Sequence, residues 1–187
     1  GASVQGIMAA GADMKACFCL GTAPDEAMLS QHIGELSHPD TAAFYRESLE
    51  RFSELFRFSP ALVVGDLHPD YISSGYAKRY AEEHCLELIS VQHHYAHIAS
   101  CMAEHGLRGP VIGISFDGTG YGDDGTIWGG EFLLCDLEGY RRAGHLASLP
   151  MPGAEQAIRE PWRMAISLLH GAFRDTGELR ARIAELG

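Results

Sequence analysis

Two histidines at helical spacing are the first residues of this chain that could do chemistry. His93 and His97 stand four apart in the run VQHHYAH, within a segment expected to be helical. Side chains at this spacing project the same way about one turn apart, so two imidazoles could hold one metal ion. Imidazole suits both zinc and iron, so the spacing does not identify the metal. His94 offers a competing pair with His97, and in a chain with ten histidines the spacing alone favours a polar helix surface.

A glycine-rich run, DGTGYGDDG, begins at Asp117 and lies between two apolar stretches. Glycine lets backbone N–H groups approach phosphate oxygens closely, and an aspartate at a strand end could hold a metal. The candidate phosphate-binding residues are Gly118, Thr119, Gly120, Tyr121 and Gly122. The run is neither a Walker loop nor a Rossmann fingerprint, because no GK[ST] and no helix follow it. A glycine-rich hairpin with solvated aspartates is an equally good interpretation.

Three further segments carry polar groups that could meet a ligand. Lys15 follows a Gly-Ala-Asp turn and could contact a phosphate, although a lone lysine after a turn is usually solvated. Asp66–Tyr71 follows a buried-looking strand, where ligands bind in open sheets, but a proline turn into a helix explains it slightly better. The arginines of Arg159–Arg163 could pair with a phosphate or with glutamates on their own helix.

Composition excludes several classes of function. The 187 residues carry a formal net charge of −11, which disfavours nucleic acid as a partner. No apolar run reaches the roughly 20 residues of a membrane helix, and no signal segment opens the chain. The five cysteines are odd in number and form no CxxC pair, which favours reduced thiols over a zinc knuckle or disulfides. We therefore expect a cytoplasmic protein without a membrane partner.

Periodicity and turn residues predict an alternation of strands and helices. We expect strands over residues 4–10, 15–20, 27–36, 61–64 and 86–91, and helices over 39–58, 73–84 and 93–105. The pattern then restarts, with strands over 111–116, 126–136 and 140–146, and a helix over 155–170 that Pro161 interrupts.

This order predicts an α/β fold in which a ribonuclease-H-like lobe is followed by the start of a second such lobe. Two lobes of this kind with a nucleotide between them make the actin-like ATPase architecture. We place the boundary near Arg108–Pro110, which gives a first lobe over residues 1–109 and a truncated second lobe over 110–187. An incomplete second lobe would leave sheet edges unpaired, which favours association or a swapped dimer.

Taken together, the motifs resemble one family. GADMK, DLHPDY, VQHHYAHIASCMAEHG, SFDGTGYGDDGTIWGGEFL, LPMPG and REPWRMA occur in this order. The chain resembles the C-terminal, TsaD-like portion of the HypF hydrogenase-maturation carbamoyltransferases, from about Ile7 to Leu169. Relatives of this domain that modify tRNA share the HxxxH element but not DLHPDY or the DGTGYG–IWGGE run.

The resemblance implies an actin-like ATPase fold and a metal, iron or zinc, held by His93, His97 and Asp117 at the nucleotide phosphates, with Mg²⁺ accompanying the nucleotide. It implies that other domains make carbamoyl-adenylate from carbamoyl phosphate and ATP. The part seen here would then pass the carbamoyl group to the C-terminal cysteine of HypE, for the cyanide ligands of nickel–iron hydrogenases. The catalytic residues implied are the same two histidines and the aspartate.

The chain also departs from the family. Ala16 stands where an asparagine is frequent, and Ala154 and Glu155 replace the usual Gly-Asp of the PGG element. The aspartate that completes the metal site in relatives would lie beyond Gly187, and the acylphosphatase, zinc-finger and adenylate-forming domains are absent from this sequence. We therefore expect the isolated chain to be inactive and to hold metal weakly.

Two alternative functions remain open at the level of sequence. One is a tRNA threonylcarbamoyladenosine-modification protein of the TsaD type, which shares the HxxxH element. The acidic charge and the DLHPDY and IWGGE elements argue against it. The other is a non-catalytic nucleotide-binding or docking module whose histidines are structural.

Overall fold

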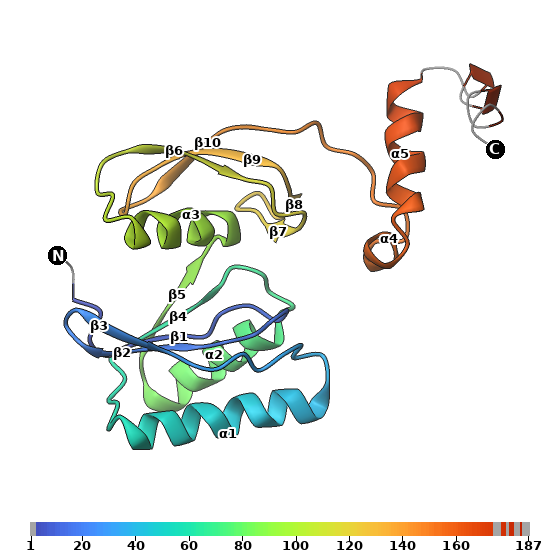
Figure 1. Ribbon diagram of the computed structural model, residues 1–187. Helices are drawn as coiled ribbons and strands as arrows, with labels where there is room; N and C mark the ends of the chain where they lie inside the picture. Colours follow the sequence, from blue (N-terminus) through green and yellow to red (C-terminus); the bar gives the residue numbers. More distant parts are fainter. Residues whose placement is uncertain (1–2, 174–176, 179, 182–183, 185–187) are drawn as a thin grey trace. The chain divides into compact units, whose positions relative to one another are not determined.

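The computed structural model describes residues 3–173, 177–178, 180–181 and 184. The chain divides into two compact units, with the division between Gly144 and His145. The candidate metal ligands lie in the first unit, whose described residues form a five-stranded sheet, a three-stranded sheet, a two-stranded ribbon and three helices (Figure 1).

The first sheet has five strands in the order β3-β2-β1-β4-β5. β1 pairs antiparallel with β2 and parallel with β4, and β4 pairs parallel with β5. Helices α1 and α2 lie together on one side of this sheet (Figure 1). The bounds are β1 Ile7–Ala9, β2 Cys19–Ala23, β3 Glu26–Leu29, α1 Pro39–Leu55, β4 Leu62–Asp66, α2 Ile72–His84 and β5 Glu87–Val91.

The core of this first sheet is aromatic. Phe18 packs edge-on against both Tyr45 and Phe52, with ring centroids 5.6 and 5.4 Å apart. The hydroxyl of Tyr45 donates to the carbonyl of Ala10 at 2.7 Å, so a polar group this deep in the core has a partner. These contacts fix α1 on the sheet and leave the carboxyl ends of β4 and β5 free to carry polar residues.

The second sheet has three strands in the order β10-β9-β6, and β6 pairs antiparallel with β9. Helix α3 lies against one face of it (Figure 1), where Ile98 and Met102 pack with Trp128 and Leu133. A two-stranded ribbon, β7 with β8, carries the glycine-rich run. The bounds are α3 His93–Glu104, β6 Val111–Ser115, β7 Gly120–Tyr121, β8 Ile127–Trp128, β9 Glu131–Cys135 and β10 Tyr140–His145.

The second unit contains two described helices, α4 Glu155–Arg159 and α5 Trp162–Ala172. The predicted interruption at Pro161 is confirmed, since this residue separates the two helices. The hydroxyl of Ser167 donates to the carbonyl of Pro150 at 2.6 Å and ties α5 to the segment that precedes α4.

Some predicted elements differ in extent. The strand expected over 27–36 ends at Leu29, and the chain then makes only an isolated bridge, Ala16 with Gly34, whose φ is +117°. The strand expected over 126–136 is two strands, because Gly130 takes a φ of +71° that breaks the ladder between Trp128 and Glu131. The mixed α/β class itself is confirmed. In the part of the chain that is described, no helix is long and apolar enough to cross a membrane.

Replacing Phe18 by alanine should lower the free energy of unfolding by about 3–5 kcal/mol, because its ring is 1% exposed and contacts two other rings. Phe44, on α1, is 44% exposed, and Phe44→Ala should change the same quantity by no more than about 0.5 kcal/mol. Urea denaturation followed by circular dichroism measures both. Equal losses in the two variants would contradict this assignment of the core.

Candidate metal centre

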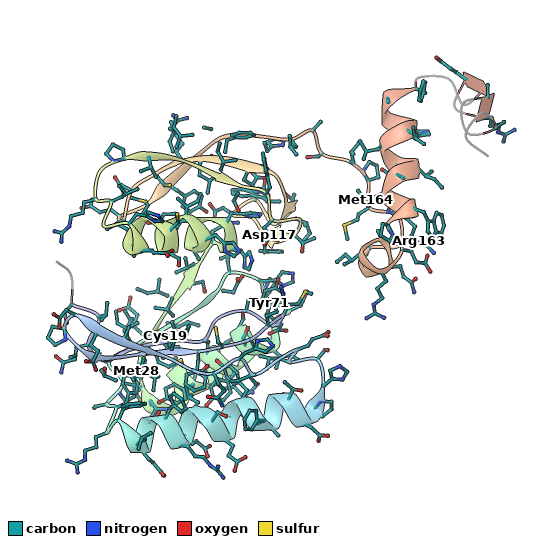
Figure 2. The ribbon with its side chains drawn as sticks, in the orientation of Figure 1. Cys19, Met28, Tyr71, Asp117, Arg163 and Met164 are labelled. Atoms are coloured by element: carbon teal, nitrogen blue, oxygen red, sulfur yellow. The ribbon has the colours of Figure 1, made fainter. Side chains whose placement is uncertain are left out.

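Three side chains that could bind a metal converge where α3 begins. His93 Nε2 lies 2.8 Å from Asp117 Oδ2 and 3.2 Å from His97 Nε2, and His97 Nε2 lies 3.6 Å from Asp117 Oδ2. One ligand atom from each residue falls within 4.8 Å of the others. Two imidazole nitrogens and a carboxylate oxygen are a donor set that fits Zn²⁺ or Fe²⁺, with further positions left for other ligands. Figure 2 shows Asp117 at the end of α3 that follows β5.

The helix brings the two histidines together, and the sheet brings the aspartate. His93 and His97 lie one turn apart on α3, whose first residue is His93. Asp117 comes two residues after β6, and β6 packs against α3. The sequence therefore places the histidine pair by local spacing alone, whereas Asp117 reaches it through the packing of a strand on a helix.

A second carboxylate lies behind His93. Asp66, the last residue of β4, has a side chain only 7% exposed, and its Oδ2 lies 2.7 Å from His93 Nδ1. Its other oxygen accepts from the backbone N–H of His68 at 2.8 Å. A carboxylate on one ring nitrogen orients the imidazole and directs the other nitrogen toward a metal. The hydrogen bond with Asp66 is the main cause that raises the pKa of His93, with burial acting in the opposite sense.

His94 is a positioning residue in this geometry. It is fully buried, and its Nδ1 lies 3.0 Å from the side-chain amide nitrogen of Gln92. Because that amide donates, Nε2 carries the proton and faces the carbonyl of Asp117 at 3.3 Å. Burial lowers the pKa of His94, which agrees with a neutral ring. Both ring nitrogens of His94 therefore make hydrogen bonds within the protein, so His94 has no nitrogen left for a metal. His93 and His97 remain as the candidate pair of imidazole ligands.

Gln92 joins the helix to the glycine-rich hairpin. Its side-chain oxygen accepts from the backbone N–H of Tyr95 at 2.9 Å and caps α3. Its side-chain amide also donates to the carbonyl of Tyr121 at 3.2 Å. Sequence reasoning missed Gln92, and it considered His94 as a competing ligand rather than as a positioning residue; it also missed the contact of Asp66 with His93. The available signals were a polar residue just before a helix and a carboxylate at the end of a buried parallel strand.

Two glycines of the hairpin are required because neighbouring side chains leave no room for a Cβ atom. A Cβ on Gly120 would lie 2.5 Å from the His94 ring, and one on Gly122 would lie 2.0 Å from the Trp128 ring. The N–H of Gly122 donates to the carbonyl of Thr126, and that of Gly118 to the side chain of Asp117. Gly118 is exposed and has nothing within 4 Å of its would-be Cβ, so the backbone at this end of the run is open to solvent.

The loop after β4 contacts the same hairpin through aromatic rings. His68 stacks on Tyr71 with centroids 4.2 Å apart and planes 4° apart, and its ring lies 5.3 Å from that of Tyr121. Thr119 is half-buried in the same hairpin. The pKa of Tyr71 is raised by burial and then by Asp66 and other nearby carboxylates, which keeps its phenol protonated.

The remaining candidates are not members of the His93, His97 and Asp117 cluster. Lys15 is exposed, takes a φ of +51° and lines a small hollow with Met14, His32, Gly34 and Glu35. In the same turn, the carboxylate of Asp13 accepts from the backbone N–H groups of Ile72 and Ser73 at 2.8 Å each, so the turn supports the start of α2. Arg159 ends α4, in the second unit.

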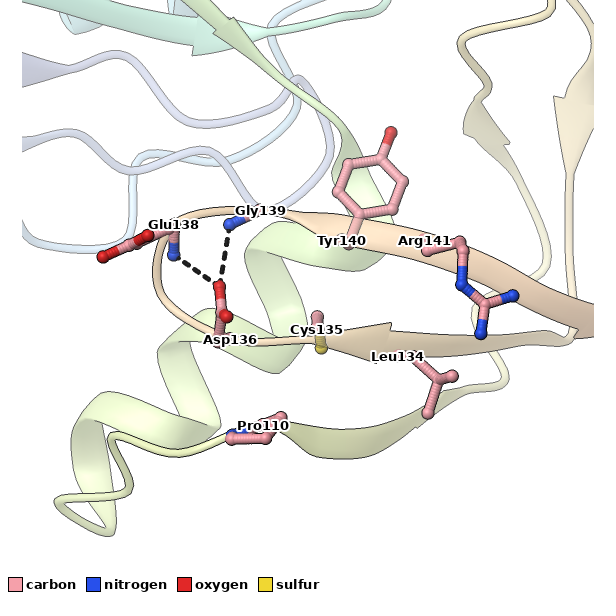
Figure 3. Close-up of a pocket in the computed structure, with 8 residues that line it drawn as sticks. All are labelled: Pro110, Leu134, Cys135, Asp136, Glu138, Gly139, Tyr140 and Arg141. Carbon is pink, nitrogen blue, oxygen red and sulfur yellow. Dashed lines mark hydrogen bonds between the residues drawn. The ribbon is translucent and has the colours of Figure 1, made fainter.

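One surface hollow, of about 420 Å³, follows the β9–β10 hairpin (Figure 3). At its base Asp136 accepts from the backbone N–H groups of Glu138 and Gly139, which closes the hairpin turn. Its lining contains none of the three candidate ligands, so it is separate from the metal centre.

Comparison with known proteins identifies the domain. Residues 2–104 match the family model described as the HypF Kae1-like domain, and residues 113–186 match the second subdomain of a carbamoyltransferase Kae1-like domain. With the mixed α/β architecture, these matches define a Kae1-like domain. The chain belongs to the HypF family.

Similar proteins include the carbamoyltransferase HypF2 of Cupriavidus necator, 45% identical over 168 residues, and carbamoyltransferase HypF of Synechocystis, 47% identical over 152. These alignments cover 90% and 81% of this chain but only 21% and 19% of those proteins. Crystal structures of full-length HypF in a phosphate- and nucleotide-bound form and of T. kodakarensis HypF align with TM-scores of 0.84 and 0.87, at 44% and 37% identity. These structural alignments cover 91% and 96% of this chain, and 22% and 23% of the HypF chains. The chain thus spans about a fifth of the length of these relatives.

Gly120→Ala should destabilise the protein by about 1–3 kcal/mol, because the added methyl group would overlap the buried His94 ring. Gly118→Ala, two residues earlier, should change the unfolding free energy by no more than about 0.5 kcal/mol, since that position is open. Chemical denaturation of both variants beside the unchanged protein provides the measurement. A tolerant Gly120 would show that the hairpin does not pack on His94 as described.

Proposed function

We propose that this chain is the carbamoyl-transfer part of a larger HypF-type carbamoyltransferase. It would pass a carbamoyl group from carbamoyl-adenylate to the C-terminal cysteine of HypE, in the synthesis of the cyanide ligands of nickel–iron hydrogenases. The observation that carries the proposal is the convergence of His93, His97 and Asp117 in a chain whose relatives are named carbamoyltransferases. Other domains of the complete protein would form carbamoyl-adenylate from carbamoyl phosphate and ATP.

We also propose that the two sheets are the ribonuclease-H-like lobes of an actin-like ATPase fold, with the boundary at 109/110. The strand order supports this, because β6, β9 and β10 repeat the arrangement of β1, β2 and β3. In both sheets the first strand pairs antiparallel with the second. Asp117 follows the first strand of its lobe, a position that in such folds faces the bound nucleotide.

The residues present suit a divalent metal. His93 and His97 would supply nitrogen ligands and Asp117 an oxygen ligand, to iron or zinc, while Mg²⁺ would accompany the nucleotide. When bound, such a cation stabilises negative charge on the phosphate and acyl oxygens. Gly118 lies beside Asp117 with open space around it, so a phosphate could approach the backbone there. We further propose that Lys15 contacts a phosphate group of the nucleotide in the complete protein.

The protein's own residues would orient the reactants in the transfer step. Asp66 fixes the ring of His93, and His94 fixes the main chain of Asp117. The acceptor thiolate attacks the carbamoyl carbon, a C–S bond replaces the C–O bond to phosphate, and AMP leaves with that electron pair. Positioned charge of this kind acts most strongly where water is excluded.

The decisive experiment is the intact mass of HypE after incubation with the complete enzyme, ATP and carbamoyl phosphate. We expect the C-terminal cysteine to gain the mass of one carbamoyl group. The double variant His93→Ala/His97→Ala should lose this product by at least about 100-fold, because two of three ligands are removed.

The matched control removes two histidines elsewhere. His84→Ala/His105→Ala alters the last residue of α2 and the residue after α3, both exposed. It should carbamoylate HypE within about twofold of the unchanged enzyme. Absence of product with an active preparation would reject the transferase proposal. Product that survives the loss of His93 and His97 would place the chemistry elsewhere.

The isolated 187-residue chain should bind metal weakly, because the family resemblance implies one further aspartate ligand besides the three in the cluster of its described residues. Dialysis against Zn²⁺ or Fe²⁺ followed by metal analysis should find less than stoichiometric metal after a metal-free wash. A stoichiometric metal that survives the wash would contradict the expectation and show that the three ligands suffice.

A further inference from the structure

An ion pair between a fully buried glutamate and a partly exposed arginine lies next to the glycine-rich hairpin. Glu131, the first residue of β9, has no solvent exposure. Its Oε2 accepts from Arg142 Nε at 2.6 Å and its Oε1 from Arg142 Nη2 at 2.8 Å, in the bidentate geometry that arginine makes with carboxylates. Burying the Glu131 carboxylate costs desolvation that its attraction to Arg142 barely offsets, so stability alone is a weak reason for the pair.

The pair is connected to the whole hairpin. The guanidinium of Arg142 lies 4.0 Å over the Trp128 ring, and its third nitrogen, Nη1, lies 3.6 Å from Asp124 Oδ2. Asp124 in turn accepts from the indole N–H of Trp128 at 2.9 Å. Residues of β8, β9, β10 and the 123–125 turn are therefore held in one geometry around the arginine.

From Glu131 the contacts lead directly to Asp117. Glu131 Oε1 accepts from the backbone N–H of Gly129 at 3.1 Å. Gly129 lies so close to the segment between β6 and β7 that a Cβ there would be 2.6 Å from the carbonyl oxygen of Gly118. The next N–H, of Gly130, donates to the carbonyl of Asp117 at 3.4 Å.

The carbonyl of Asp117 is thus held from two sides. Gly130 contacts it from the hairpin, and His94 contacts it from α3. With its main chain fixed, Asp117 directs Oδ2 at His93 and His97. A shift of the 129–130 peptide would move this carboxylate away from the two imidazoles.

We propose that the Glu131–Arg142 pair is a positioning device that fixes Asp117 for metal binding, acting through the Gly129–Gly130 peptide. Glu131 is a positioning residue and does not touch the metal. The proposal rests on the metal centre of the proposed function, and the test below separates the two.

The test is titration of the 187-residue chain with Co²⁺, whose visible absorption reports the number and geometry of its ligands. Glu131→Gln keeps the size of the side chain and an acceptor for Gly129 but loses the charge that holds Arg142. We expect the dissociation constant to rise about 10–100-fold, as for other residues that support a metal ligand, with a changed absorption band.

The matched control is Leu133→Ala, in the same strand. Leu133 is also fully buried, and it packs in the cluster of Ile98 and Met102. This variant should lower the melting temperature at least as much as Glu131→Gln, yet bind Co²⁺ within about twofold of the unchanged chain at a temperature where all three are folded. That contrast is the signature of positioning rather than of general stability.

The Co²⁺ titrations distinguish failure of the positioning role of Glu131 from failure of the metal centre. Unchanged Co²⁺ binding in Glu131→Gln, or losses of affinity that follow the melting temperature equally in both variants, would overturn the inference and leave the metal centre intact. If His93→Ala/His97→Ala binds Co²⁺ as well as the unchanged chain, the metal centre fails and the inference with it. Should Glu131→Gln not fold, Arg142→Lys keeps the charge without the bidentate contact and carries the same expectations.

Discussion

The imidazole of His93 is held between two carboxylates from different sheets, and the arrangement of the site depends on this contact. Asp66 comes from the end of β4 in the five-stranded sheet, and Asp117 follows β6 in the three-stranded sheet. One ring therefore connects two layers whose strands are not hydrogen-bonded to each other. Helix α3, which begins at His93, is the element that makes this possible, because it leaves β5 and packs on β6.

The same contact sets the electrostatics of the site. Two acidic groups and two imidazoles gather at one point, so a positive charge is favoured there. The pKa of His93 is raised, first by its hydrogen bond with Asp66 and then by the charges of Asp66 and Asp117. A divalent metal would replace the proton at Nε2 while Asp66 continues to hold Nδ1. His94, beside it, is kept neutral by burial and serves only to hold the main chain.

The glycine-rich hairpin illustrates how one sequence feature serves several purposes. Gly120 and Gly122 are needed because a side chain would overlap His94 and Trp128. Gly129 is needed because its backbone lies against that of Gly118. Only Gly118, of these four, leaves open space on its Cβ side. The hairpin is thus first a packed support for Asp117, and it leaves open space only beside Gly118.

The sequence by itself determined the local features of this protein, which depend only on residues close together in the chain. Four-residue spacing on a helix pairs His93 with His97, Pro161 separates two helices, and the alternation of strands and helices indicates the α/β class. The family resemblance, confirmed by the comparisons, also rests on contiguous motifs. None of these depends on how distant segments pack.

Only the tertiary structure decided which distant groups meet. Asp66 is 27 residues from His93 in the chain, and its contact requires the register of β4 beside β5 as well as the position of α3. Glu131 looks like an ordinary strand residue until Arg142 and Gly129 are placed around it. Local propensity carries no information about such pairs, because the energy that fixes them comes from packing whole elements together. Sequence could therefore name the candidate ligands, while the residues that orient them emerged from the fold.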